Sequence, residues 1–224
     1  MRASDFDRRV AMYAALGEPA RLALVDDLVC SDRSPKELGE RHGLPTNLLA
    51  HHLDVLESAG LVARCTSAGD RRRRYVRLVP QSLVPLRPIG PVPATVLFLC
   101  SHNSARSQLA AALWTARTGH PASSAGTHPS PKVHRGAVAA GRRAGLNLSD
   151  ATPRLVDQIP DDARVITVCD RVHEELVATD QWWHWSVPDP VDVGTADAFD
   201  AVILDLDTRI RIILSSSSSD RSIS

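Results

Sequence analysis

Residues 95–110 read TVLFLCSHNSARSQLA and decide the fold of the second half of this 224-residue chain. The apolar run Thr95–Leu99 is typical of a buried strand, and the stretch QLAAALWTART that follows Ser107 is typical of a helix. A short polar loop from Cys100 to Arg106 lies between them. A strand, a loop and a helix N-terminus in this order direct backbone N–H groups at one point, so the segment predicts a site for a tetrahedral anion.

The residue types in this loop indicate chemistry as well as binding. The Arg106 guanidinium can hold two oxygens of an anion at once, and the positive field of the loop predicts a lowered pKa for Cys100, whose thiolate is the nucleophilic form. We expect the oxyanion to be bound by the whole loop: Ser101, His102, Asn103, Ser104, Ala105, Arg106 and Ser107.

Two residues further along the chain complete the predicted catalytic set. A nucleophile that expels an oxygen leaving group needs an acid, and Asp189 stands between two prolines before a helix predicted at residues 195–214. Cys169 follows the strand-like run 164–168 as Cys100 follows its own strand. Parallel strands end at one edge of a sheet, so we expect the two sulfurs to approach each other. The alternative for Cys169 is a buried cysteine that ends a strand.

The first half of the chain has a different pattern. Ser34-Pro35-Lys36-Glu37 combines an N-cap serine, a first-turn proline and a glutamate at the third position, which predicts a helix to about His42. A second helix from Thr46 to about Gly60 has Leu49, Leu53 and Leu56 on one face. Two strand-like runs then flank a turn at residues 67–70, which predicts a hairpin. Helix, turn, helix and hairpin together form a winged helix-turn-helix domain.

The hairpin is strongly basic in an otherwise neutral chain. The whole chain has 26 basic and 26 acidic residues, but residues 64–77 contain six arginines and one acid. We expect DNA contacts from the start of the second helix and from the hairpin, namely from Thr46, Asn47, Ala50, His51, Arg71, Arg72, Arg73 and Arg74. The alternative is that the arginines form only a solvated edge that discourages strand pairing.

The proline-rich segment 80–93 divides the chain, because five prolines in it preclude a regular helix. We expect a DNA-binding domain at 1–80, a linker at 81–93, an α/β domain at 94–214 and a disordered tail at 215–224. No apolar stretch reaches the roughly 18 residues of a membrane span, and we expect a cytoplasmic protein without membrane contact. Four cysteines are too few for a disulfide scaffold.

Two family resemblances follow from these motifs. SPKELGERHGLPTNLLAHHLDVLESAGLV with the hairpin AGDRRRRYVRL resembles the ArsR/SmtB repressors, whose members are homodimers that bind palindromic operators and release them on binding an inducer. CSHNSARSQLA, SAGT at 124–127 and HWSVPDP at 184–190 resemble the low-molecular-weight protein tyrosine phosphatase fold, with HWSVPDP closest to its arsenate reductase branch. That fold is a four-stranded parallel sheet with helices on both faces.

The resemblances imply roles for particular residues. Cys100 would be the nucleophile, Arg106 the oxyanion clamp, Asp189 the general acid and Cys169 the resolving cysteine, while Ser107 stabilises the thiolate and Asn103 orients the loop. Thioredoxin-linked reductases have one more cysteine after the resolving one, and DRVHEELVATDQ has none. The external reductant, thioredoxin or a low-molecular-weight thiol, therefore stays open, and we expect no bound cofactor.

The leading hypothesis is an arsenic-response fusion, a dimeric DNA-binding repressor joined to an enzyme that reduces arsenate to arsenite. Cys30 and Cys65 are the remaining thiols, and we consider them a candidate arsenite site, since soft thiolates hold trivalent arsenic well. The alternative is that both are buried small hydrophobes. Two other functions remain: a DNA-binding protein with a phosphatase domain for phosphoesters, and a repressor whose anion pocket only senses an oxyanion.

Overall fold

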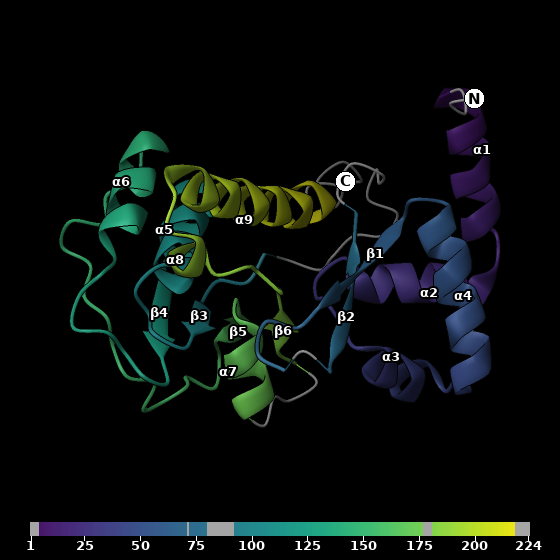
Figure 1. Ribbon diagram of the computed structural model, residues 1–224, viewed down its shortest axis with the longest axis horizontal. Coiled ribbons are helices and arrows are strands. Elements are labelled where there is room, and N and C mark those ends of the chain that lie inside the picture. Colours follow the sequence, from purple (N-terminus) through teal and green to yellow (C-terminus); the bar gives the residue numbers. More distant parts are fainter. Residues whose placement is uncertain (1–4, 71, 80–91, 177–180, 218–224) are drawn as a thin grey trace, which may run out of the picture. The chain divides into compact units, whose positions relative to one another are not determined.

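The computed structural model describes residues 5–70, 72–79, 92–176 and 181–217. Within them the chain forms two compact units (Figure 1). The first contains helices α1–α4 and the strands β1 and β2, and the second contains strands β3–β6 and helices α5–α9. Most of the predicted linker, residues 80–91, and Arg71 lie outside the described residues.

The first unit is four helices followed by a hairpin. Its elements are α1 (Asp5–Leu16), α2 (Pro19–Leu28), α3 (Pro35–His42), α4 (Thr46–Ser58), β1 (Val62–Thr66) and β2 (Arg74–Leu78). The predicted cap of α3 is confirmed: the Glu37 N–H donates to Ser34 Oγ over 3.3 Å, and the Ser34 N–H donates to Glu37 Oε2 over 2.7 Å. Gly43, with φ of 61°, ends α3 in the left-handed region that suits glycine.

A small apolar core holds this unit together. The predicted inner face of α4 is confirmed, because Leu49, Leu53 and Leu56 are all at most 3% exposed. They pack with leucines and valines of the other elements, which are Leu24, Val25, Leu28, Leu38, Leu61, Val62, Val76 and Leu78. β1 and β2 pair antiparallel, with Cys65 opposite Tyr75. The order helix, turn, helix and hairpin is consistent with the expected arrangement.

The second unit is built on one parallel sheet. Its elements are β3 (Val96–Cys100), α5 (Arg106–Thr118), β4 (Ala122–Gly126), α6 (Arg135–Arg143), β5 (Arg164–Thr167), α7 (Asp170–Glu175), β6 (Trp183–His184), α8 (Pro190–Val193) and α9 (Ala196–Ser217). The strand order is β4-β3-β5-β6, and every neighbouring pair is parallel. The prediction of a four-stranded parallel α/β sheet is therefore confirmed.

The core of this unit lies around the central strand. β3 is buried along its whole length, and the Phe98 ring packs against Trp114 and Trp185 at centroid distances of 6.0 and 5.7 Å. α5 packs against β3, β4 and α9, whereas α7 packs against β3 and β5. Trp185 is thus part of the core.

Two boundaries differ from the sequence-based expectation. α9 continues to Ser217, so residues 215–217 are helical where a disordered tail was predicted, and residues 218–224 lie outside the described part. The short helix α8 was not predicted; Asp189 caps it by accepting a hydrogen bond from the Val191 N–H. Among the described helices, none is long and apolar enough to cross a membrane.

Candidate functional site

The loop between β3 and α5 is held in one shape by the buried side chain of Asn103. This residue adopts a positive φ of 46°, which asparagine tolerates better than most residues. Its Oδ1 accepts hydrogen bonds from the Arg154 N–H at 2.8 Å and from Gln108 Nε2 at 3.1 Å, and its Nδ2 donates to Ser107 Oγ at 2.8 Å. Arg154 was not identified from the sequence, since it is 51 residues away from Asn103; Gln108 directly follows the loop but was not singled out.

Cys100 ends β3 and is buried at the base of this loop. Its Sγ lies 3.0 Å from Ser107 Oγ. Burial raises the pKa of the Cys100 thiol, and the opposing effects of Arg106 and Ser107 do not fully offset it. The expected lowering of this pKa is therefore wrong for the anion-free loop, because the removal of the sulfur from water outweighs the positive field.

Gly126 allows the loop to lie against the neighbouring strand. It is directly opposite Cys100 in the register of β3 and β4. A Cβ atom at this position would meet the carbonyl oxygens of Ser101 and Cys100 at 2.5 and 2.8 Å and the Asn103 nitrogen at 2.9 Å. The loop can therefore lie this close to β4 only because residue 126 in the SAGT segment is a glycine.

Arg106 and Asp189 form an ion pair. Arg106 is the first residue of α5; its Nη2 donates to Asp189 Oδ2, and its Nη1 donates to the Val187 carbonyl at 3.0 Å. Burial disfavours the charged guanidinium, but Cys169, Asp189 and Cys100 together raise the pKa of Arg106 above its ordinary value. The predicted clamp and the predicted acid are thus brought together, and a bound anion would compete with Asp189 for the guanidinium.

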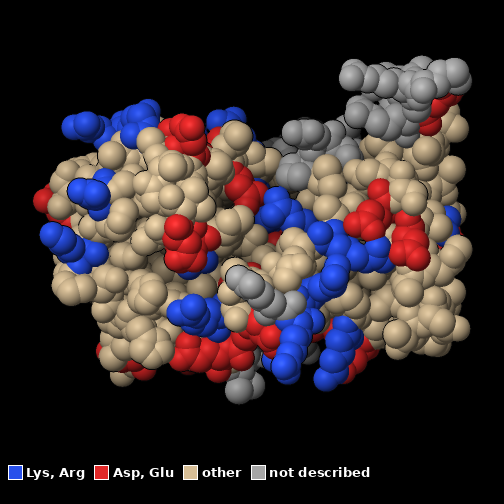
Figure 2. Space-filling model, viewed as in Figure 1, with Lys and Arg blue, Asp and Glu red and all other residues tan. Residues whose placement is uncertain are grey.

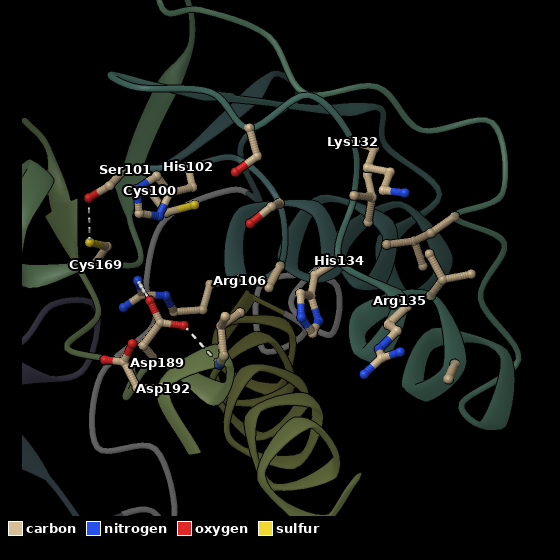
Figure 3. A pocket seen from close by; sticks show the side chains of 18 of the residues that line it. Cys100, Ser101, His102, Arg106, Lys132, His134, Arg135, Cys169, Asp189 and Asp192 are labelled. Atoms are coloured by element: carbon tan, nitrogen blue, oxygen red, sulfur yellow. Dashed lines mark hydrogen bonds and ion pairs between the residues drawn. The ribbon is translucent and has the colours of Figure 1, made fainter. Parts of the chain in front are cut away.

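Cys169 lies at the same sheet edge as Cys100. β3 and β5 are parallel neighbours, and Cys169 follows β5 as the N-cap residue of α7. Its Sγ is 3.3 Å from Ser101 Oγ, the hydroxyl of the residue after Cys100 (Figure 3). Both thiols are buried and neither forms a disulfide. The structure therefore places the second thiol at the anion loop.

A buried polar network, which sequence reasoning missed, adjoins Cys169. His184 is fully buried; its Nε2 lies 3.1 Å from Asp170 Oδ1 and its Nδ1 lies 2.8 Å from Thr167 Oγ1. The His173 ring stacks on His184 at 4.0 Å. Burial opposes ionisation of Asp170, but its hydrogen bond with His184 keeps the pKa of this carboxyl below the ordinary value. The network connects the starts of α7 and of the acid loop.

The anion loop opens into a cleft. All predicted oxyanion-binding residues except His102 are buried, and His102 is exposed. Beyond Cys100 and Arg106, the cleft is lined by the segment before α6 and by α6 itself, including Lys132 and Arg135 (Figure 3). Among the described residues, no group of three or more His, Cys, Asp or Glu side chains could hold a metal ion.

The predicted DNA-contacting residues of the first unit are on its surface. Thr46, Asn47, Ala50 and His51 are exposed at the start of α4, and Arg72, Arg73 and Arg74 are exposed on the hairpin. Figure 2 shows Lys and Arg side chains gathered over the hairpin region. Arg64 of β1 is held by two acidic residues: its Nη2 lies 2.7 Å from Asp54, and its Nη1 pairs with Glu57. This arginine ties β1 to α4, so the available charge is smaller than the sequence count suggests.

Cys30 and Cys65 are half-buried, and neither forms a disulfide. Cys65 lies in β1, whereas Cys30 follows α2, three residues before Arg33. Arg33 forms an antiparallel bridge with Val76 of β2, and β2 pairs on its other side with β1. β2 therefore separates Arg33 from β1.

The sheet, the loop and the buried cysteine and arginine define an α/β domain with an anion-binding loop. Residues 95–222 match the model of the family described as low molecular weight phosphotyrosine protein phosphatase, and the chain belongs to this family. No curated protein matches the chain.

Several solved structures are similar to part of the chain. An arsenate reductase from Archaeoglobus fulgidus is 27% identical, with 52% of this chain and 95% of that chain covered and a TM-score of 0.44. A thioredoxin-dependent arsenate reductase from Corynebacterium glutamicum is 27% identical, with 59% and 65% covered and a TM-score of 0.43. A tyrosine phosphatase from Erwinia amylovora is 17% identical, with 56% and 94% covered and a TM-score of 0.49.

Proposed function

We propose that the second unit reduces arsenate to arsenite and that the first unit is a winged-helix repressor controlled by the product. The observation that carries the reductase proposal is the placement of two buried thiols, Cys100 and Cys169, at the ends of adjacent parallel strands beside Arg106. A phosphoester hydrolase needs one nucleophilic thiol. A two-electron reduction of arsenate that leaves a protein disulfide uses two thiols, because both are oxidised.

The proposed chemistry begins in the loop. The Cys100 sulfur attacks arsenic, a sulfur–arsenic bond forms, and one arsenate oxygen leaves as water. Asp189, which the anion has displaced from Arg106, takes up a proton from solvent and gives it to that oxygen. Cys169 then attacks the Cys100 sulfur. The new disulfide forms as the sulfur–arsenic bond breaks, and its electron pair stays on arsenic, which leaves as arsenite. Two thiols are oxidised, As(V) becomes As(III), and an external thiol reduces the disulfide.

Because the pKa of Cys100 is raised, we propose that the substrate also acts as the base that removes the thiol proton. The anion-free loop holds a thiol, which must lose its proton before it attacks. An arsenate dianion has basic oxygens and displaces Asp189 from the Arg106 guanidinium as it binds. In this proposal the arriving anion accepts the thiol proton, and Arg106 and Ser107 then stabilise the thiolate.

The direct test is arsenite formation by the purified chain, supplied separately with a thioredoxin system and with low-molecular-weight thiols, alongside hydrolysis of an aryl phosphate. Arsenite formation supports the reductase. Aryl phosphate hydrolysis without arsenite would replace it with the second candidate, a phosphatase, which the same loop geometry favours because arsenate and phosphate share shape and charge. Neither activity would favour a domain that only senses an oxyanion.

Cys169→Ser separates the two enzymatic candidates. We expect multiple-turnover arsenate reduction to fall by at least about 100-fold, because no second sulfur is present to release arsenite. Aryl phosphate hydrolysis should change less than about 3-fold, since Cys100, Arg106 and Asp189 are intact. The measurement is the pair of initial rates for each variant, with Cys100→Ser as the control that loses both. Unchanged arsenate turnover in Cys169→Ser would remove this residue from the mechanism.

The proposed repressor reads palindromic operator DNA as a homodimer. The exposed start of α4 is suited to the major groove, and the arginines at the hairpin tip to phosphates. Val10 and Tyr13 of α1 are 51% and 64% exposed, which supports α1 as the dimer surface. Operator binding by gel shift, together with the mass of the free chain in solution, tests both parts; a monomer that binds no palindrome would contradict them.

Arsenite would act on this unit through Cys30 and Cys65, with the second protomer of the dimer able to supply one of the two thiols. Soft thiolates are the ligands that trivalent arsenic prefers. The expected result is that arsenite releases operator DNA from the native chain and not from Cys30→Ser or Cys65→Ser. Equal release from all three would show that these cysteines are not the sensor.

A further inference from the structure

The wall of the cleft opposite Cys100 is positively charged. Lys132, Arg135 and Arg142 line it from the segment before α6 and from α6 itself. All three side chains are exposed, and within the described residues none of them forms an ion pair. The neighbouring Arg143 differs, because it does not line the cleft and its Nη2 lies 2.6 Å from Asp200. The cationic side chains on the cleft side of α6 therefore have no acidic partner among the described residues.

This wall is fixed relative to the anion loop. Three backbone hydrogen bonds tie the segment that carries Lys132 to the loop, because the N–H groups of His128, Ser130 and His134 donate to the carbonyls of residues 101, 102 and 104 at 2.8–2.9 Å. The wall and Cys100 are consequently parts of one surface.

The start of α6 is held from its other side as well. The His134 ring stacks on Phe199 of α9 at 5.2 Å, and its Nδ1 accepts a hydrogen bond from the Gly136 N–H. A Cβ at Gly136 would meet the Phe199 ring at 2.4 Å, so the helix start lies directly on that ring. Arg135 therefore projects from a fixed point.

The two ends of the cleft differ in their charged side chains: at the anion loop the acidic residues stand beside Arg106, which pairs with Asp189, whereas the described charged residues at the other end are all basic. Asp189 and Asp192 line it on the side of the anion loop, and Lys132 and Arg135 line it on the other side (Figure 3). Apolar side chains of Val138, Leu146 and Leu148 line it as well. A small ligand with carboxylates at one end and a short apolar part next to them would match the lining at the end of Lys132 and Arg135.

The second unit itself supplies no further thiol. The chain has four cysteines, and Cys100 and Cys169 are the two that follow residue 65. A disulfide between them has no third sulfur in this unit that could take it over, so the electrons must come from an external thiol that reaches the anion loop. The cleft leads to that loop.

From these observations we propose that the cleft binds a small carboxylate-bearing peptidic thiol, whose carboxylates pair with Lys132 and Arg135 and whose sulfur reaches the disulfide at the loop. The thiolate attacks one sulfur of the Cys100–Cys169 disulfide, a mixed disulfide forms, and the other cysteine leaves as a thiolate that takes a proton. A second thiol molecule releases the first as its own disulfide. The inference rests on the proposed reductase function for its purpose, but binding can be measured without it.

The first experiment measures binding with a probe that cannot react. S-methylglutathione has the charges of a peptidic thiol and no free sulfhydryl, and calorimetry on the full chain gives its Kd. We expect the double variant Lys132→Ala/Arg135→Ala to weaken binding about 10-fold, since each exposed ion pair is worth up to about 1 kcal/mol. Arg143→Ala, the matched control, should change Kd less than 2-fold. The diethyl ester of the probe should bind the native chain about 10-fold more weakly than the probe itself. Its Kd should be the same for the native chain and for the double variant.

A second experiment measures arsenite formation against the concentration of glutathione and of its diethyl ester. The double variant should raise KM for glutathione about 10-fold, leave KM for the ester unchanged and leave kcat within 2-fold. Absence of S-methylglutathione binding, or equal binding by native and double-variant chains, would overturn the inference. Arsenite formation with thioredoxin alone would also overturn it and would leave the reductase standing. Binding without any arsenite formation would overturn the reductase and leave the anionic subsite.

Discussion

The two candidate functional regions are constructed in opposite ways. Around the anion loop, side chains are buried and fixed by hydrogen bonds, as in the pair formed by Cys100 and Ser107 and in the bonds that hold Asn103. On the first unit, Thr46 and Arg72 to Arg74 are exposed at the ends of regular elements. Chemistry at a reacting atom depends on sub-ångström placement, whereas contact with phosphates depends mainly on charge. Substitutions should therefore act steeply in one region and gradually in the other.

The steepest expected response is at Gly126. Gly126→Ala places a Cβ within 2.5–2.9 Å of three loop backbone atoms, so the loop must shift. We expect a loss of at least about 100-fold in both arsenate reduction and aryl phosphate hydrolysis, since misplacement by about 1 Å has effects of this size. Initial rates measure it, and thermal unfolding shows whether the fold persists. Gly17→Ala, where an added Cβ would meet backbone atoms no closer than 3.6 Å, is the control for the loss of a glycine.

An intermediate and graded response is expected at the hairpin. Replacing Arg72, Arg73 and Arg74 by alanine should weaken operator binding about 10- to 100-fold and lower the slope of log K against log salt by about 2–3, because about 0.9 counterions are released per phosphate contact. Arg64→Ala is informative beside it: its guanidinium is engaged by Asp54 and Glu57, so the salt slope should stay constant. An unchanged slope in the triple variant would assign these arginines to a solvated edge.

The smallest expected effect concerns the protonation of Cys100. Burial raises its pKa, so the anion-free chain should alkylate slowly at pH 7 and faster as pH rises past the ordinary thiol range near 8.5. Ser107→Ala removes a hydrogen bond that lowers this pKa and should slow alkylation at pH 8 a few-fold. Iodoacetamide labelling, read at the Cys100 peptide by mass spectrometry, measures the profile. A plateau already reached below pH 7 would mean that the loop holds a thiolate.

A substitution at Asp189 tests whether the bound anion competes with this carboxylate for Arg106. Asp189→Asn removes the charge that pairs with Arg106, so inorganic phosphate or arsenate should bind a few-fold more tightly while turnover falls about 10- to 100-fold for want of an acid. Phosphate inhibition of Cys100 alkylation gives the affinity, and initial rates give the turnover. Weaker anion binding in this variant would show that the ion pair does not compete with the anion.

The sequence by itself determined the local features. The cap at Ser34 and Glu37, the apolar face of α4 and the strand–loop–helix from Thr95 onward all follow from hydrogen bonds and periodicities that span a few residues. The four-stranded parallel sheet was implied by the family resemblance. Parallel pairing also predicted the sheet edge at which Cys169 lies, because side chains that follow parallel strands emerge at one edge of the sheet.

Only the tertiary structure decided the features that depend on burial and on distant partners. The direction of the Cys100 pKa reverses because desolvation is set by the whole core, which a loop motif does not report. Arg106 pairs with Asp189 across 83 residues, Arg154 braces Asn103 across 51, and His184 meets Asp170 in a buried network. Charge count misjudged Arg64 for the same reason, since its acidic partners come from another element. The local sequence pattern determines which side chains are available in each element, and tertiary packing determines which of them come into contact.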